Sequence, residues 1–435
     1  MCIRDSNTTV APTEEAINIE ENATQIEQPK ETQTNIKEDV EEVKAATENV
    51  ETQSEPIEQT PMAALQSIEP ASANATALKT QIESATSDIT INLDPGVYEF
   101  DSEIKNTRGI TVTLIGAVDG IGQPATQFTM ASTVTGAPRF IRLESGTLNM
   151  SNIQVNGTKG LNGGVSARNV IATNCDFTNN YTNDGVSGGG TIRVTGGTLT
   201  VEGSSFTDNS VGAASDGGAI SSEYSGNIRI NNSVFDKNER IGNNNQYGGA
   251  ISVKQPGVAN TSVEITNSIF TNNVLDASGS WTTGGAVRIY GTNNLTSVLI
   301  DNVLFKGNKA QRAITNNGGA LAFMATTNSK ITNCTFIDNS AGKYGGAVYY
   351  ENSNGNYQII NSTFVGNKAS VAGNGVSVYS SSTTIDSSTL ISNNLSTHGT
   401  NPKITIKDSI LAGTPTYASS SIIYSGTNLA QKNIS

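Results

Sequence analysis

A phenylalanine followed three residues later by an asparagine recurs every 26–35 residues along most of the sequence. The phenylalanines are Phe177, Phe206, Phe235, Phe270, Phe305, Phe336 and Phe364, and Leu390 takes the eighth place. The asparagines are Asn180, Asn209, Asn238, Asn273, Asn308, Asn339, Asn367 and Asn393. A motif that stays in phase over eight units indicates an array in which each unit stacks on its neighbours.

Two further marks recur in each unit. Three residues before the phenylalanine stands Asn174, Asn232, Asn267, Asn302, Asn333 or Asn361, with Gly203 as the substitute in the second unit. Glycine pairs follow, from Gly188-Gly189 to Gly345-Gly346, and a degraded copy lies at 373–375. Asparagine and glycine are the residues that most readily adopt a left-handed backbone. We therefore predict a sharp bend with positive φ at each of these asparagines.

The segments between these marks alternate apolar and polar side chains, which is typical of short strands. In one unit we predict strands at 250–253, 263–265 and 268–270, with Asn267 as the bend. One unit is then one coil of three strands. The sequence predicts an all-β fold at 89–435: a single-stranded right-handed parallel β-helix of about ten coils. Phenylalanines would stack between coils, and the bend asparagines would form a hydrogen-bonded ladder that fixes the register.

The region before the repeats divides into two parts. Residues 1–60 hold 15 acidic and 4 basic side chains, so they carry −11 of the net charge of −13. Their low hydrophobicity predicts a disordered acidic Thr/Glu/Gln-rich tail. Residues 61–88 are predicted to be a linker and a capping helix, because Ala75, Leu78, Ile82 and Ala85 follow helical spacing. Such a helix would cover the open end of the first coil.

The motif pair F-x-x-N and G-G-A-[IVL] resembles the polymorphic outer-membrane protein repeat over roughly residues 152–393. The opening I-x-I-x-L-x-P-G-x-Y at Ile89 resembles pectin-lyase-like β-helix proteins. This resemblance implies a secreted or cell-surface protein with an adhesin-like binding role or a structural role. It implies no catalytic residue. Neither an export signal nor an anchor is recognisable, so we expect the sequence to be a fragment of a longer protein.

Outward positions of the strand after each glycine pair predict a ligand surface. Five of them would lie on neighbouring coils: Arg288, Tyr290, Tyr349, Glu351 and Tyr379. Tyrosines with a few charges suit glycan or protein ligands. Trp281, the single tryptophan, stands in the longest loop before a glycine pair and is a further candidate. Ordinary surface tyrosines on strands are the alternative interpretation.

An enzyme of the same fold is the alternative function, namely a polysaccharide lyase or a glycoside hydrolase. Such enzymes need paired carboxylates or a carboxylate with a cation. The outward rows contain no two carboxylates on adjacent coils, so we predict no catalytic residue, metal ion or cofactor. We predict Cys175 and Cys334 to be small buried residues, because both take the serine position two before the phenylalanine. His398 is predicted to be a solvated loop residue.

Charge and hydropathy limit the partners. Beyond residue 60 the chain holds 24 acidic and 22 basic side chains, whereas nucleic-acid binders need a basic stripe. The sequence also lacks an apolar run long enough for a transmembrane helix. We expect a monomer that binds glycans or surface proteins and no nucleic acid.

Overall fold

Every described residue belongs to one compact unit of the chain. The predicted tail at 1–60 lies outside the described residues. The structure, a computed structural model, describes residues 72–134, 136, 138–158, 163–183, 189–212, 216–242, 247–254, 256–277, 283–292, 294–312, 316–326, 328–351, 356–413 and 421–431.

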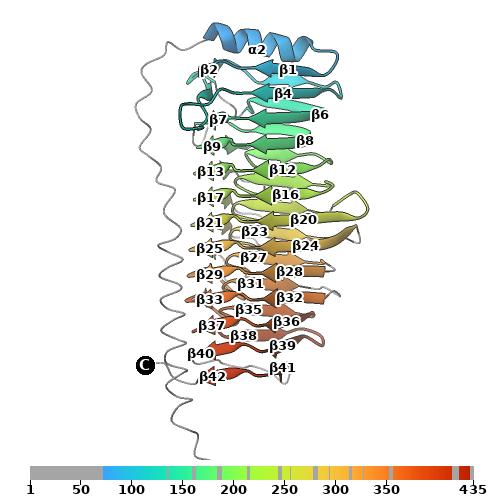
Figure 1. Cartoon of the computed structure of the whole chain (residues 1–435), viewed down its shortest axis with the longest axis vertical. Helices are drawn as coiled ribbons and strands as arrows, with labels where there is room; N and C mark the ends of the chain where they lie inside the picture. Colours follow the sequence, from blue (N-terminus) through green and yellow to red (C-terminus); the bar gives the residue numbers. More distant parts are fainter. Residues whose placement is uncertain are drawn as a thin grey trace, which may run out of the picture. The chain divides into compact units, whose positions relative to one another are not determined.

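Three parallel sheets wind into a β-helix, with successive coils stacked along one axis (Figure 1). The thirteen-stranded sheet carries the repeat phenylalanines. Its strands are β2 (Gly96–Phe100), β5 (Thr126–Met130), β7 (Ile153–Asn156), β9 (Asp176–Thr178), β13 (Ser205–Thr207), β17 (Val234–Asp236), β21 (Ile269–Thr271), β25 (Leu304–Lys306), β29 (Thr335–Ile337), β33 (Thr363–Val365), β37 (Thr389–Ile391), β40 (Ile410–Ala412) and β42 (Leu429–Gln431).

The 22-stranded sheet has two side-by-side columns of strands. The post-glycine column holds β3 (Ile104–Asn106), β11 (Ile192–Val194), β15 (Ile220–Glu223), β19 (Ile251–Lys254), β23 (Val287–Tyr290), β27 (Leu321–Met324), β31 (Val348–Glu351), β35 (Val376–Tyr379) and β38 (Leu395–His398). The pre-bend column holds β1 (Ile89–Asn92), β4 (Thr111–Ile115), β12 (Leu199–Glu202), β16 (Ile228–Asn231), β20 (Thr261–Thr266), β24 (Leu295–Asp301), β28 (Asn328–Thr332), β32 (Asn356–Ile360), β36 (Ser382–Asp386), β39 (Lys403–Lys407) and β41 (Ile422–Ser425). β6 (Ile141–Ser151) and β8 (Val165–Thr173) run through both columns.

The third sheet was not predicted. Its seven short strands directly follow the F-x-x-N asparagines: β10 (Tyr181–Thr182), β14 (Ser210–Val211), β18 (Glu239–Gly242), β22 (Val274–Ala277), β26 (Lys309–Arg312), β30 (Ser340–Ala341) and β34 (Lys368–Ala369). A middle coil therefore has four strands rather than three. The phenylalanine sheet has thirteen strands in the described residues, more than the ten coils predicted. The first and last coils lack the repeat motif, so a motif count misses them.

The predicted bends are confirmed. The six asparagines before the phenylalanines have φ between 47° and 54°, and Gly203 has φ 55°. The glycine pairs also form turns, since Gly284 has φ 82°. A Cβ on the next residue, Gly285, would collide with the carbonyl oxygen of Gly319 on the following coil. Strand register aligns Ile192 with Ile220, so the first pair is Gly189-Gly190, one residue later than predicted.

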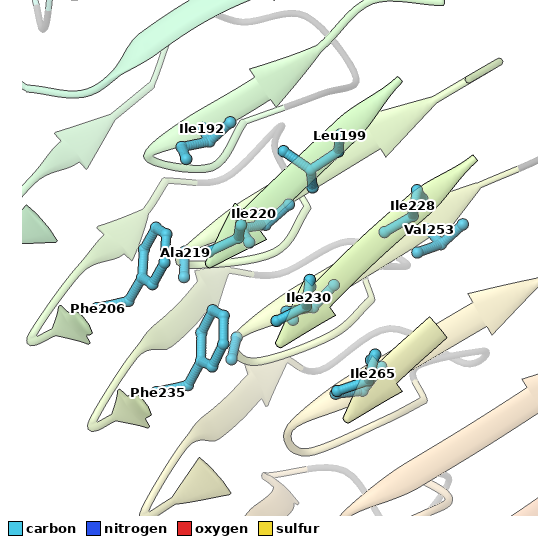
Figure 2. Close-up of a cluster of buried hydrophobic side chains, with 14 of the residues drawn as sticks. Ile192, Leu199, Phe206, Ala219, Ile220, Ile228, Ile230, Phe235, Val253 and Ile265 are labelled. Carbon is cyan, nitrogen blue, oxygen red and sulfur yellow. The ribbon is translucent and has the colours of Figure 1, made fainter. Parts of the chain in front are cut away.

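The predicted phenylalanine stack fills the coils. Successive rings from Phe177 to Phe364 lie 4.6–5.1 Å apart, with interplanar angles of 2–17°. Figure 2 shows Phe206 and Phe235 at equivalent positions on successive coils, in a cluster with buried residues such as Ile220 and Ile230. Identical side chains meet because the strands pair in register, as Phe206 does with Phe235.

The continuous ladder is formed by the F-x-x-N asparagines, not by the bend asparagines. From Asn180 to Asn367, each Nδ2 donates to the Oδ1 of the next ladder asparagine at 2.9–3.0 Å, and all of these residues are buried. Among the bend asparagines, Asn302 donates to Asn267, but Asn267 donates to Asn231. The bend side chains are exposed enough to choose other acceptors, which breaks their ladder.

The predicted helix covers the first coil. Helix α2 (Ser72–Ser84) lies across the end of the stack above β1 (Figure 1). Its buried residues Ala75, Leu78 and Ile82 belong to the same core as the coils. Asn106 Nδ2 donates to the Ile82 carbonyl oxygen at 2.7 Å, which ties the helix to β3. The apolar end of the stack is thus shielded from water.

Replacing a ladder asparagine should weaken the fold more than replacing a bend asparagine. Asn273→Ala removes the bonds of Nδ2 to Phe235 O and Asn308 Oδ1 and leaves two Asn238 donors without their acceptor. We expect the free energy of unfolding to fall by about 3 kcal/mol, measured by urea denaturation. The control Asn302→Gly keeps a residue that tolerates φ 53° and should cost less than about 1 kcal/mol. Equal losses would contradict this account of the ladder.

Candidate functional site

Strand register aligns the outward positions of the post-glycine column into two rows, as the sequence predicted. The first outer row is Arg193, Ser221, Ser252, Arg288, Ala322, Tyr349, Ser377 and Ser396. The second outer row is Glu223, Lys254, Tyr290, Met324, Glu351, Tyr379 and His398. The five predicted ligand residues on strands therefore share one face over β23 to β35.

These residues are less accessible than a ligand surface was expected to be. Arg288, Tyr349 and Glu351 are only 2%, 3% and 4% exposed, whereas Tyr290 and Tyr379 are half-buried. The residues in front of the glycine pairs account for this, because they form a column of their own beside the first outer row. Tyr247 pairs with Thr283, Thr283 with Asn317, and Tyr344 with Ala372, all in parallel. The side chains of Tyr247 and Tyr344 reach the outer rows, where they contact Arg288 and His398.

Arg288 lies against two tyrosine rings. Its Cζ atom is 3.4 Å from the ring centre of Tyr247 and 4.9 Å from that of Tyr290. Burial lowers the pKa of the Arg288 guanidinium to about 10, although Tyr247, Asp216, Tyr290 and Glu351 favour its charge. Nε and Nη1 have no hydrogen-bond partner among the described residues. The stacked guanidinium thus retains in-plane donors for a further group.

Charged side chains gather around Asp216, which directly precedes a glycine pair. Its buried carboxylate interacts electrostatically with Arg288, Lys254 and Arg240, while burial raises its pKa. Burial lowers the pKa of Arg240, in β18, to about 10. Lys254 also pairs with Glu223 on the preceding coil at 3.0 Å.

His398 ends the second outer row within an aromatic cluster. The centroid of its ring lies 4.1 Å from that of Tyr344, 5.1 Å from Tyr379 and 6.1 Å from Tyr349. It is the last residue of β38 and half-buried, so the prediction of a solvated loop residue was wrong. Burial, followed by the positive charge of Lys343, lowers its pKa to about 4.

Glu351 and Tyr349 connect the charged groups near Arg288 with the aromatic rings around His398. The Tyr349 hydroxyl and the Glu351 carboxylate form a hydrogen bond. Burial raises the pKa of both groups, and the Glu351 charge raises that of Tyr349 further. Arg288 and Lys343 oppose the rise at Glu351. The face thus combines buried charge near Arg288 with aromatic rings around His398.

The described residues were also compared with the features expected of a carboxylate-based enzyme, a metal site and a membrane-spanning helix. In the two outer rows, Glu223 neighbours Lys254, and Glu351 neighbours Met324 and Tyr379, so no two carboxylates occupy adjacent coils. No group of three or more His, Cys, Asp or Glu in the described ranges is placed to hold a metal ion. Within the same ranges, no helix combines the length and hydropathy needed to span a bilayer.

The cysteines take the predicted role of small buried residues. Cys175 and Cys334 are free, and burial raises the pKa of both thiols to about 12. In other coils a serine takes the same position, and its hydroxyl oxygen accepts a hydrogen bond from a backbone N–H group of the preceding coil. Cys175 N, for example, donates to Ser204 Oγ at 3.1 Å.

Several site residues escaped the sequence analysis. Tyr247 and Tyr344 stand directly before glycine pairs, and this shared phase was the available signal. His398 was detectable by aligning 395–398 with 376–379, which β35 and β38 do in the structure. Arg240 had no signal, because the third sheet itself was not predicted. Trp281 lies outside the described residues.

The buried thiols should be unreactive in the folded protein. In a Cys2→Ser variant we expect no reaction with a thiol reagent in native buffer and two reactive thiols per chain in urea. Both remaining cysteines are buried with raised pKa, which leaves little thiolate near neutral pH. Absorbance of the released thiolate measures the reaction. Rapid native labelling would contradict the burial of this position.

The single histidine permits a direct pH measurement. Proton NMR should show His398 titrating near pH 4 rather than near 6.5. Because the folded pKa lies below the unfolded one, the unfolded state binds more protons between these values. Stability present above pH 6.5 is therefore lost as the pH falls toward 4. His398→Gln should remove this part of the pH dependence, and Tyr344→Ala should raise the pKa by exposing the ring. A midpoint near 6.5 in the unsubstituted protein would refute the burial.

Comparison with known proteins supports the repeat. Residues 333–351, from the bend asparagine to the end of β31, match the Chlamydia polymorphic membrane protein repeat. No curated protein sequence matched the chain significantly. Two solved structures from Azotobacter vinelandii are similar, both A-modules of mannuronan C-5 epimerases. The AlgE6 module is 13% identical with a TM-score of 0.43, and the match covers 83% of this chain and 96% of the AlgE6 module. The AlgE4 module is 11% identical with a TM-score of 0.36, and the match covers 84% of this chain and 96% of the AlgE4 module. The chain is thus a parallel β-helix repeat protein that carries a polymorphic membrane protein repeat.

Proposed function

We propose that this protein is a surface-displayed, adhesin-like β-helix that binds glycans without catalysis. The observation that carries the proposal is the pair of half-buried tyrosines, Tyr290 and Tyr379, in one outer row, with the Arg288 guanidinium against the Tyr290 ring. They are three coils apart, or about 14 Å at the usual strand spacing. A chain of several sugar rings can contact both.

The chemistry of the row suits sugars. Tyrosine rings offer an apolar face for the C–H face of a sugar and a hydroxyl for hydrogen bonding. Lys254 and Glu223 add half-buried polar groups at one end of the row, and Tyr344 and His398 add rings at the other. The stacked coils hold these groups rigidly, which limits the entropy lost on binding.

The proposal also includes the location of the protein at a cell surface and the right hand of its coils. The match at 333–351 is to a membrane protein repeat, which favours display at a cell surface. We propose that the coils are right-handed, because nearly all crossovers between parallel strands have that hand. The structural alternative, a passive stalk, would need no ligand at all.

A carbohydrate-active enzyme is the second candidate. Its supporting observation is the group of His398, Tyr349 and Glu351, whose pKa values are all shifted by burial on one face. Such clusters also occur at catalytic sites. Incubation with acidic and neutral polysaccharides separates the candidates, since depolymerisation or a changed sugar configuration would favour the enzyme.

A glycan array tests the binding proposal. We expect the protein to bind selected glycans and Tyr379→Ala to lose about tenfold or more in affinity, because one stacking ring is removed. The matched control is Tyr224→Ala, which removes an exposed tyrosine outside both outer rows, five coils away. Circular dichroism confirms that both variants are folded. Absence of any glycan ligand, or equal losses in both variants, would argue for a stalk.

A further inference from the structure

The outer face of the phenylalanine sheet carries an uncharged row of side chains. The strands of this sheet from β17 to β40 lie one above another in a single column (Figure 1). Each phenylalanine points into the coil, so the residue directly before it points outward. Strand register aligns these residues into one row, here called the leading row: Val234, Ile269, Leu304, Thr335, Thr363, Thr389 and Ile410. All seven are half-buried, and none is charged.

The leading row resembles a sheet face that is covered rather than one that meets water. On the same coils, the outward positions of the pre-bend column include Arg229, Glu264 and Lys330. Strands that are buried on both faces instead carry apolar residues at consecutive positions. Ile269-Phe270 has this pattern, although only Phe270 lies in the core. The leading row therefore has the composition of a contact surface.

The residues after the phenylalanines extend this surface over four coils. From β29 to β40 they are Ile337, Val365, Ile391 and Ala412, and neither row holds a charge there. Val365 and Ile391 are half-buried like the leading row, whereas their neighbours cover Ile337 and Ala412 more fully. Lys306, on the coil before β29, ends the uncharged stretch. We call the eight outward residues of these four strands the uncharged face.

We propose that the uncharged face binds the same face of a second copy of this protein. A partner that repeats at the coil spacing, about 4.8 Å, can contact each successive coil in the same way. A second copy has this spacing. A twofold axis would pair the two uncharged faces with each other. Neither copy then buries an unpaired charge, which would be costly.

The size of the surface makes one such contact weak. Even the whole leading row spans only about 29 Å, and a strand of three residues is about 10 Å long. The resulting area, on the order of 300 Å², is well below the roughly 800 Å² that each partner buries in a stable complex. A dilute solution should thus hold monomers, whereas many copies held on one surface would associate through summed contacts. The inference therefore rests on the surface display proposed above.

Beads coated with the full chain test this contact. Maleimide beads would be coupled through Cys2, because Cys175 and Cys334 are buried. We expect coated beads to cluster with one another and not with albumin-coated beads. Val365→Lys should reduce the clustered fraction about fivefold or more, because each contact would then bury a charge. The matched control Gln358→Lys places the same charge on the pre-bend column one strand earlier in the chain and should cluster normally.

Both substitutions should leave the fold intact, which circular dichroism checks. Lys306 occupies the row of Val365 two coils earlier, and Lys330 lies beside Gln358 on the adjacent coil. Ile391→Lys, on the coil after Val365, is a second variant that should also reduce clustering. Unsubstituted beads that do not cluster, beads that cluster equally with albumin, or full clustering by either lysine variant of the face would overturn the proposal.

Two further measurements separate this contact from glycan binding. Clustering should persist in about 1 M sodium chloride, since salt at this concentration screens only charged contacts. A loss of clustering in salt would contradict an uncharged contact. Tyr379→Ala beads should cluster normally, and a loss there would assign the clustering to the outer rows and overturn the inference. Normal clustering by a protein that binds no glycan would instead refute the proposed glycan binding alone.

Discussion

The buried asparagine ladder is the interaction on which the coil stack depends. Each ladder side chain bonds to the same atom of the same residue type one coil further along, as Asn238 does with Asn273 and Asn273 with Asn308. From Asn209 onward, each ladder side chain also donates to the carbonyl oxygen of a phenylalanine on the preceding coil, such as Phe235 for Asn273. A slip by one residue would bury these amides without partners. The ladder therefore sets the register that apolar stacking leaves weakly defined.

Register in turn determines which side chains meet on the outer face. Arg288 lies beside Ser252 and Ala322, and Glu351 lies beside Tyr379, because the post-glycine strands from β19 to β35 are aligned without a register shift. Repeat lengths of 26–35 residues are absorbed in the connections rather than in the strands. The charged groups around Arg288 and the rings around His398 are thus positioned by the register of the strands.

Local sequence patterns predicted much of this scaffold. The bends, the phenylalanine stack, the alignment of the outer rows and the capping helix all follow from periodicity and from residues that tolerate positive φ. These patterns did not predict the burial of the outer rows. That burial depends on Tyr247 and Tyr344, whose side chains reach the rows from outside the predicted strands. The ladder was assigned to the wrong asparagines for a similar reason. Both sets recur in phase, and only their burial separates them.

The glycine pairs and the ladder make neighbouring coils chemically interchangeable. Between Phe177 and Asn367, each coil offers its successor the same bend, ring and amide, so a unit there could be duplicated or deleted with little change at the new junction. The candidate site occupies the coils from β15 to β38, and the earlier coils contribute none of the residues proposed to contact a ligand. Recombination among the earlier units would then change the length of the protein while leaving its recognition chemistry intact. Length and specificity can evolve separately in a protein built this way.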